Sequence, residues 1–528
     1  MKRLKYGTAT LVLATAGLFL VACGTNSSPS KPSESASVNK SKDTSTFTYA
    51  ISGDPASTNP INASDRWGLT VSNIIYSPLM TVEPDGKQKN VLAESIEPSA
   101  DGLSILVKLK KDIKWSDGQP LTADDVVFTY TQKAKKENNN ADKLWIGDKP
   151  ITTQKVDDHT VKFVLPAPSA SAVNNITTET FIIPEHAYKN ISDFSVKQLP
   201  VTPVGTGPYK LKEYKTGQYL TFEANEHYFG GAPAIKNLTL RIIESTDTAK
   251  VALQKGEVDA AVVLPSDISD LDAKKITVHP YSETRIGYLG LNTKLGALAN
   301  VKVRQAIFYA LDKSELNRAA YLSDKYYSTP YSFLPPSNPY VTKDVEKYKT
   351  DIDKSKALLS EAGASNVNLN IAFSSTDPAQ KIQATLIQQQ LKKVGISVTL
   401  EGSDATAIYA ELKKPNTTKY NLFLGGYIMG NDPDLYAALF KTNGSSNYFK
   451  TDNAKTDQLF NEGAVELNEA KREKIYDKLQ KEISEDARIY PIVDNKKILA
   501  VNNRITNIKQ ANLVPIYTFE DISKLKIK

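Results

Sequence analysis

Histidine, cysteine and paired acidic residues build most catalytic and metal sites, and this sequence holds few of them in useful patterns. The 528-residue chain has four histidines and one cysteine. The histidines, at positions 159, 186, 227 and 279, are scattered, and neither HExxH nor GxSxG occurs. The acidic pairs Asp124-Asp125 and Asp157-Asp158 stand where a helix start and a turn are expected. We therefore expect no enzyme activity, no metal site and no cofactor.

Two glycine clusters suggest binding through the backbone. Gly205 and Gly207 resemble a phosphate loop, but Pro208 follows at once and no GKS/T occurs, so nucleotide binding is not expected. The run from Gly425 to Gly430 begins with two adjacent glycines, which permit the close approach of another backbone. The alternative for this run is an ordinary buried strand that ends in a glycine turn.

The single cysteine, Cys23, follows a segment typical of an export signal. Three basic residues near the N-terminus precede an uncharged run over 6–21, which is too short and too rich in small residues for a membrane span. Leu20-Val-Ala-Cys23 matches the lipobox, in which the cysteine is lipidated and becomes the new N-terminus. A buried cysteine in the core is the alternative. We expect a lipoprotein signal peptide over 1–22, lipidation of Cys23, and no internal disulfide.

The segment after Cys23 has the composition of a disordered tether up to residue 45, rich in Ser, Lys, Pro, Asn and Thr. A tether of this kind is typical of a Gram-positive-type envelope. The expected location is therefore the extracellular face of the cell membrane, with the chain held by its lipid.

The charge and the size of the chain limit the functions and the number of domains that it can have. The formal net charge is +6, and it falls to about +3 when Lys2, Arg3 and Lys5 leave with the signal. No basic stripe with interleaved aromatic residues is present, so nucleic-acid binding is not expected. About 500 mature residues exceed a single core, and two or three domains are expected.

Regular patterns predict the elements that would position a site. Leu103, Ile105, Val107 and Leu109 alternate with other residues as in a strand with one covered face. A turn and a helix capped by Thr122 follow. Helix and strand alternate from 351 to 400, which predicts an α/β layered lobe.

Three strings carry a resemblance to a known family. DGLSILVKLKKDIKWSDGQPLTADDVVFTY at 101–130, the GTGPY string within 203–209 and VKVRQAIFYALD at 301–312 resemble the family 5 solute-binding proteins, the oligopeptide- and dipeptide-binding receptors of ABC importers. The resemblance implies an α/β, two-lobed periplasmic-binding-protein-like fold (type II, cluster C) with an extra domain inserted in lobe I. The expected domains are lobe I over 46–76, 201–290 and 493–528, the extra domain over 77–200, and lobe II over 291–492.

The resemblance also implies a function without catalysis. A receptor of this family captures extended peptides in a cleft between its lobes and delivers them to the permease subunits of an ABC importer, and we expect it to be a monomer. Alternatives within the fold are a receptor for a signalling peptide, or for a nickel complex or haem held by residues such as Arg66 and Arg285. A secreted hydrolase is the alternative from another class.

Site residues are placed by matching this chain to the family pattern. The first docking segment of the family falls on Ser64, Asp65, Arg66 and Trp67, and the second falls on Gly425, Gly426, Tyr427, Ile428, Met429 and Gly430, with Arg285, Tyr288, Asn431 and Asp432 as further peptide-binding candidates.

One position departs from the family pattern. Where the enteric-type receptors have an Asp that pairs with the α-amino group of the ligand, this chain has Gly430. Either Asp432 takes over that ammonium, or the peptide N-terminus is not fixed and longer peptides overhang. The alternative for Asp432 is a capping role at a helix that starts near Leu435.

Overall fold

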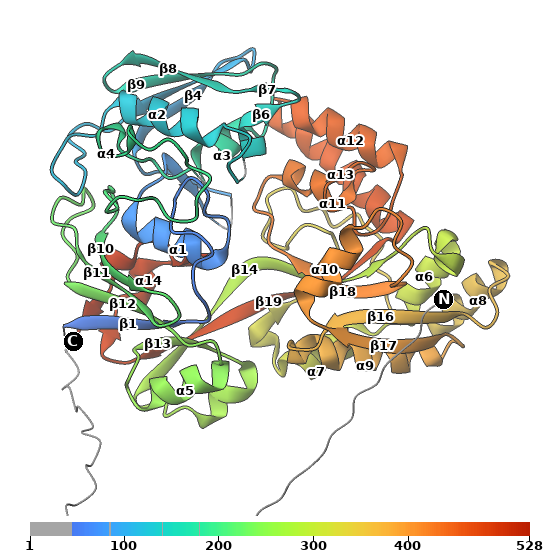
Figure 1. Ribbon diagram of the computed structural model, residues 1–528. Helices are drawn as coiled ribbons and strands as arrows, with labels where there is room; N and C mark the ends of the chain where they lie inside the picture. The colour runs from blue at the N-terminus through green and yellow to red at the C-terminus, as the bar shows by residue number, and fades with distance from the viewer. Residues whose placement is uncertain (1–44, 84–85, 140, 179) are drawn as a thin grey trace, which may run out of the picture. The chain divides into compact units, whose positions relative to one another are not determined.

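The computed structural model describes residues 45–83, 86–139, 141–178 and 180–528 (Figure 1). Cys23 and most of the predicted tether lie outside the described residues. All of the elements below belong to one compact unit, Thr44–Lys528. Among the described helices, none is both long enough and apolar enough to cross a membrane.

One large sheet runs through this unit. Its strands follow the order β10-β11-β12-β1-β13-β19-β14-β18-β16-β17, and the short β15 pairs with β19. The strands are β1 (Thr46–Ile51), β10 (Tyr209–Lys215), β11 (Tyr219–Ala224), β12 (Asn237–Ile242), β13 (Ala260–Val263), β14 (Ile276–Leu291), β15 (Tyr327–Ser328), β16 (Asn368–Ser374), β17 (Ser397–Ser403), β18 (Leu422–Tyr427) and β19 (Ile489–Asn502).

The long strands β14 and β19 join the two halves of the sheet. They pair antiparallel along most of their length, and their register shifts between Ser282 and Ile286. The residues skipped by this bulge include Glu283, which is 2% exposed, and Thr284, whose φ is 52°. Figure 1 shows β14 and β19 crossing from one group of helices to the other.

The first half of the sheet surrounds β1. Parallel pairing with β12 and β13 covers both edges of β1, and Phe47, Tyr49 and Ile51 enter a core that also contains the end of the chain. Its other elements are α1 (Arg66–Ile75), α5 (Thr246–Gln254), α14 (Ile508–Ala511), β20 (Ile505–Thr506), β21 (Leu513–Val514), β22 (Thr518–Phe519) and β23 (Lys526–Ile527).

A separate four-stranded sheet, in the order β4-β5-β9-β8, is built by the segment between α1 and β10. Ile105, Val107 and Leu109 of β5 are buried as the alternation predicts, but Leu103 precedes the strand and is 40% exposed. The elements of this segment are β2 (Met80–Val82), β3 (Gln88–Asn90), β4 (Ala93–Pro98), β5 (Ser104–Leu109), α2 (Ala123–Lys133), β6 (Trp145–Ile146), β7 (Lys149–Pro150), β8 (Thr152–Asp157), β9 (Thr160–Val164), α3 (Ala172–Thr177) and α4 (Glu185–Tyr188).

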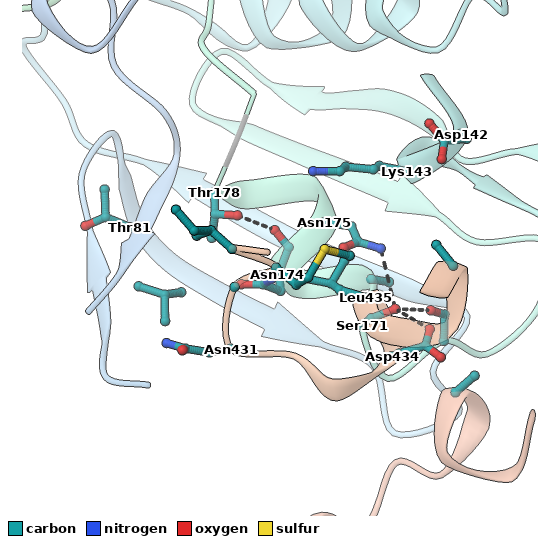
Figure 2. A pocket seen from close by; sticks show the side chains of 18 of the residues that line it. Thr81, Asp142, Lys143, Ser171, Asn174, Asn175, Thr178, Asn431, Asp434 and Leu435 are labelled. Carbon is teal, nitrogen blue, oxygen red and sulfur yellow. Dashed lines mark hydrogen bonds between the residues drawn. The ribbon is translucent and has the colours of Figure 1, made fainter. Parts of the chain in front are cut away.

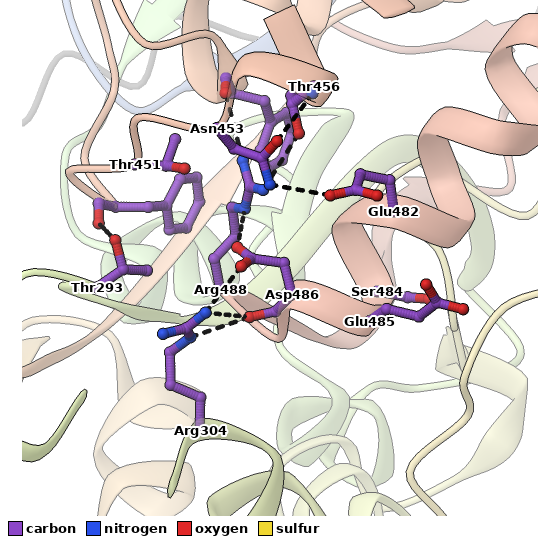
Figure 3. Close-up of polar contacts among 12 residues, drawn as sticks. Thr293, Arg304, Thr451, Asn453, Thr456, Glu482, Ser484, Glu485, Asp486 and Arg488 are labelled. Atoms are coloured by element: carbon purple, nitrogen blue, oxygen red, sulfur yellow. Dashed lines mark hydrogen bonds and ion pairs between the residues drawn. The ribbon is translucent and has the colours of Figure 1, made fainter. Parts of the chain in front are cut away.

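The second half of the sheet, β18-β16-β17, is parallel and carries most of the helices. A buried polar cluster fixes the helix that precedes β19: Asp486 accepts hydrogen bonds from both Arg304 and Arg488 (Figure 3). The helices are α6 (Val301–Ala310), α7 (Lys313–Tyr321), α8 (Ile352–Glu361), α9 (Pro378–Lys392), α10 (Ala405–Lys413), α11 (Ala437–Phe440), α12 (Ala454–Val465) and α13 (Glu469–Asp486).

Candidate functional site

A cavity of about 660 Å³ lies where three parts of the described chain meet. Its size falls within the range of small-molecule sites, roughly 300 to 1,000 Å³. The small-sheet segment contributes 81–83, 142–151 and 168–178, the first half of the large sheet contributes Asn73, Thr284 and 514–520, and the second half contributes 428–438 and the end of α12.

Two hydrogen bonds join parts of the chain beside the cavity. The Ala170 N–H donates to the Ala464 carbonyl at 2.9 Å, and the Asn431 side-chain amide donates to the Glu83 carbonyl at 2.8 Å. Both bonds join residues far apart in the sequence. Each links the small-sheet segment to the part of the chain that contains the second half of the large sheet.

The residues that follow β18 form one wall. Ile428, Met429, Gly430 and Asn431 all line the cavity, and all four are among the predicted peptide-binding residues. Among the residues that the structure describes, none hydrogen-bonds the backbone N–H or C=O of Ile428 or Met429. This short wall therefore offers main-chain donors and acceptors to an extended ligand.

The glycine pair before this wall lies against side chains of the protein itself. A Cβ on Gly425 would lie 2.7 Å from the Tyr288 hydroxyl oxygen, and a Cβ on Gly426 would lie 2.1 Å from a guanidinium nitrogen of Arg285. The two glycines make room for these side chains of the protein itself. Gly425, Gly426, Tyr427, Tyr288 and Arg285 are not among the residues that line the cavity.

The first predicted docking segment also lies away from the lining. Asp65 caps α1 by accepting from the Gly68 N–H, and Arg66 pairs with Glu283 at 2.5 Å. Trp67 packs edge-on against Tyr49, and Ser64 is exposed. On the same helix it is Asn73, one to two turns further on, that reaches the cavity.

Asp432 is occupied by a neighbour. Its two carboxylate oxygens accept from the Arg472 guanidinium at 3.1 and 2.7 Å, and both residues are buried. One oxygen also accepts from the Asp434 N–H at 2.9 Å, so Asp432 caps the 3-10 turn Pro433–Tyr436. Asp432 does not line the cavity.

Asp434 is the carboxylate of this segment that reaches the cavity. Figure 2 shows Asp434 and Ser171 facing each other across the junction of the two parts, with a long 3.5 Å contact from the serine hydroxyl. Burial, followed by the charge of Asp432, raises the pKa of Asp434 to about 6. The sequence indicated Asp434 only as a neighbour of Asp432. Its place at the cavity emerges from the structure, in which Asp432 is the residue that pairs with Arg472.

Sequence reasoning also missed the small-sheet segment and the C-terminal segment as cavity walls. Trp145, Ile146, Ser171, Ile516 and Tyr517 line the cavity but belong to no recognised motif. No local signal marks them, because the contacts that bring them to Ile428 span hundreds of residues.

The lining has no evident metal-ligating set. None of the residues that line the cavity is a histidine or cysteine, and the described part of the chain has no group of three or more His, Cys, Asp or Glu that could hold a metal ion. The oxygen and amide groups of the lining instead suit a ligand that is itself rich in hydrogen-bonding groups.

Comparison with known proteins agrees with the fold. The sequence pattern of the bacterial extracellular solute-binding proteins, family 5, matches residues 87–449. The oligopeptide-binding protein AppA of Bacillus subtilis is 29% identical, with 92% of this chain and 93% of that protein covered. The heme-binding protein A of Haemophilus influenzae is 28% identical, with 95% and 96% covered.

Solved structures that resemble this chain belong to proteins of the same kind. The ABC transporter substrate-binding protein CtaP of Listeria monocytogenes has a TM-score of 0.87 and 37% identity, with 91% of this chain and 99% of that chain covered. The Bacillus subtilis AppA structure, in complex with a nonapeptide, has a TM-score of 0.74 and 25% identity, with 92% and 99% covered. The expected two-lobed α/β fold is confirmed. The chain belongs to the bacterial extracellular solute-binding proteins of family 5.

Proposed function

We propose that this chain is the substrate-binding receptor of an ABC importer and that its ligands are peptides taken up in an extended form. The observation that carries this proposal is the wall at Ile428 and Met429, two residues that line the cavity and whose backbone groups have no hydrogen-bond partner among the described residues. A receptor for peptides of varied sequence must hold what all peptides share, their own backbone N–H and C=O groups.

The rest of the lining suits side chains of varied shape. Ile146, Leu435, Val465 and Ile516 give apolar surface, while Ser171 and Asn175 give small polar groups. Thr81 adds a buried hydroxyl without a hydrogen-bond partner in the described chain. Such a mixed surface binds several side chains moderately well, which fits weak sequence preference.

A metal chelate or haem is the second candidate, because haem- and peptide-binding proteins both occur among the relatives. The two arginines considered for that role are engaged elsewhere: Arg66 with Glu283, and Arg285 with Asn495 at 3.0 Å. Neither lines the cavity. The lining therefore favours peptide over chelate, and a signalling peptide would occupy the same walls.

The location belongs to the same proposal. Lipidation of Cys23 would hold the receptor at the outer face of the cell membrane, and the tether up to residue 45 would let the folded unit reach the permease subunits. The receptor is proposed to act as a monomer without catalysis of its own.

Mass spectrometry of the small molecules that co-purify with the protein tests the ligand class directly. We expect intact peptides, since a receptor returns its ligand unchanged, whereas a hydrolase would leave fragments. Thermal denaturation with a peptide library gives a second reading: binding to the native form alone adds RT ln(1 + [L]/Kd), roughly 2.7 kcal/mol at a hundredfold excess over Kd. Recovery of a haem or nickel complex, with no peptide shifting Tm, would overturn the proposal.

A further inference from the structure

The charges around the cavity are unequal in sign. Four carboxylates line it, those of Glu83, Asp142, Asp434 and Glu520, whereas Lys143 is the one lysine in the lining, which contains no arginine. Whether such a cavity prefers a positively or a negatively charged ligand depends on which of these charges the protein itself already neutralises.

Glu520 is neutralised. Lys89 pairs with one of its oxygens at 2.6 Å, and the Asn512 amide donates to the other at 2.7 Å. Glu83 and Asp142 have no ion pair and no side-chain hydrogen bond within the described parts of the chain. Within the described parts of the chain, no basic side chain therefore pairs with these two carboxylates at the cavity wall.

Asp434 is also left without a counter-charge in direct contact. The nearest guanidinium, that of Arg472, is shared by both oxygens of Asp432, and the amine of Lys441 bonds to Asn461 at 2.6 Å. Among the described residues, the Ser171 hydroxyl is the one side-chain donor to Asp434, at 3.5 Å. Figure 2 shows Asp142 and Lys143 above Asn175 in the view and Asp434 below it, on segments from different parts of the chain.

We propose that this cavity selects ligands by positive charge, so that it binds peptides carrying a lysine or arginine side chain in preference to the same peptides carrying glutamate. The inference rests on the proposed peptide-binding function and adds the class of peptide. Asp434 and Glu83 are partly buried, whereas Asp142 is exposed. A carboxylate without a counter-charge attracts a cation more strongly where it is partly buried among apolar groups than in water. An anionic side chain placed there would lose its hydration and meet like charge.

Apolar residues of the lining contribute binding that does not depend on the charge of the ligand. Ile428, Met429, Leu435 and Ile516 bury the aliphatic part of any side chain, and a lysine or arginine has a long aliphatic stem ending in its charge. A neutral peptide should therefore still bind. The charge of the side chain should decide the order of affinities among peptides of equal size.

Isothermal titration of the full-length protein, purified in detergent, tests this with Leu-Lys-Leu, Leu-Gln-Leu and Leu-Glu-Leu. We expect the lysine peptide to bind about tenfold more tightly than the glutamine peptide, and the glutamate peptide about tenfold more weakly than the glutamine peptide. Asp434→Asn and Glu83→Gln should each reduce the ratio of the affinity for Leu-Lys-Leu to the affinity for Leu-Glu-Leu by about fivefold or more. Asp353→Asn, an exposed site on α8 outside the cavity, removes the same charge and should leave the ratio unchanged.

The outcomes separate the two proposals. If the glutamine peptide binds but the lysine and glutamate peptides match it within twofold, charge selection is overturned and peptide binding stands. If the ratio falls equally in Asp353→Asn, the effect comes from net charge and the cavity assignment is overturned. If none of the three peptides binds while a non-peptide ligand co-purifies, the proposed function fails and the inference fails with it.

Discussion

Asp432 and Asp434 stand two residues apart and face different surroundings. Asp432 holds Arg472 beneath the cavity wall, and Asp434 lines the cavity with one hydroxyl in contact. A structural carboxylate and a ligand-facing one respond differently to loss of charge, so substitutions at the two positions give separate tests.

Asp432→Asn should lower the free energy of unfolding by about 3 kcal/mol, because it leaves the buried Arg472 without a counter-ion. Urea denaturation measures this. The matched control is Asp344→Asn, which breaks an exposed pair with Lys481 on the same helix, α13, and should cost less than about 1 kcal/mol. If Asp432→Asn instead left stability intact and weakened only peptides with a free amine, Asp432 would be the ammonium partner after all.

Binding of a cationic peptide should weaken as the pH falls. The pKa of Asp434 is raised to about 6 because the residue is buried and Asp432 lies close; Arg472 and Lys441 oppose the shift. At pH 7.5 the carboxylate is charged, and at pH 5 it is protonated, so its attraction for a cation is lost. We expect Kd for Leu-Lys-Leu to rise about tenfold over this interval at constant salt. In Asp434→Asn, Kd for this peptide should change little with pH. If Kd of that variant still rose as the pH fell, another group would be responsible for the pH dependence.

At this scale the sequence predicted part of the site. Residues 428 to 431, which the match to the family gives as peptide-binding candidates, line the cavity and follow directly from a recognisable strand; their role in binding stays a prediction. The positions of Arg285 and Tyr288 depend on the space above Gly425 and Gly426, which is a tertiary property. The pairing of Asp432 with Arg472 spans 40 residues and has no local signature.

At the scale of elements, local patterns were reliable where one face of a strand or helix is buried. The alternation in β5 and the helix starting at Ala123 follow the sequence closely, with Asp125 accepting from the Thr122 N–H at 2.9 Å. The bulge between Ser282 and Ile286 was not predicted, because it depends on how β14 and β19 pair across more than 200 residues. The limits assigned to the domains stay predictions.

The end of helix α13 offers a test of what holds β19 in place. Asp486 lies between Arg304 and Arg488, at 2.8 and 2.6 Å, and Arg488 is fully buried (Figure 3). Asp486→Asn should lower the free energy of unfolding by about 3 to 5 kcal/mol, because two buried cations lose their shared anion. Glu485→Gln is the control: this neighbour is exposed and should cost less than about 0.5 kcal/mol. Equal losses in the two variants in urea denaturation would contradict the role given to the cluster.

For the whole molecule, the proposed anchor can be separated from the fold. Cys23→Ser should release the protein into the medium or leave it as unprocessed precursor, because the cysteine sulfur would carry the lipid. Tm of the released protein should match that of the wild type. Cell fractionation with immunoblotting measures the release. Processed protein that remains bound to the membrane without its cysteine would refute the lipoprotein proposal.

One contact between the small-sheet segment and the end of α12 lies outside the cavity lining and can be tested by mutation. Leu467 lies just after α12, and a Cβ on Gly102 of the small-sheet segment would be 2.6 Å from its Cδ1. Leu467 does not line the cavity and remains 46% exposed. The contact can therefore favour the closed arrangement without holding the ligand.

Leu467→Ala should weaken peptide binding about fivefold while leaving Tm of the free protein unchanged. We expect a loss of about 1 kcal/mol, that of a half-buried leucine, and we expect it in binding because the role proposed for the contact with Gly102 is to favour the closed arrangement. Calorimetric titration with Leu-Gln-Leu, together with thermal denaturation of the free protein, measures both quantities. Val156→Ala, an exposed apolar site on β8, is the control and should change neither. If Leu467→Ala lowered Tm of the free protein and left Kd unchanged, the contact would stabilise the fold and play no part in closure.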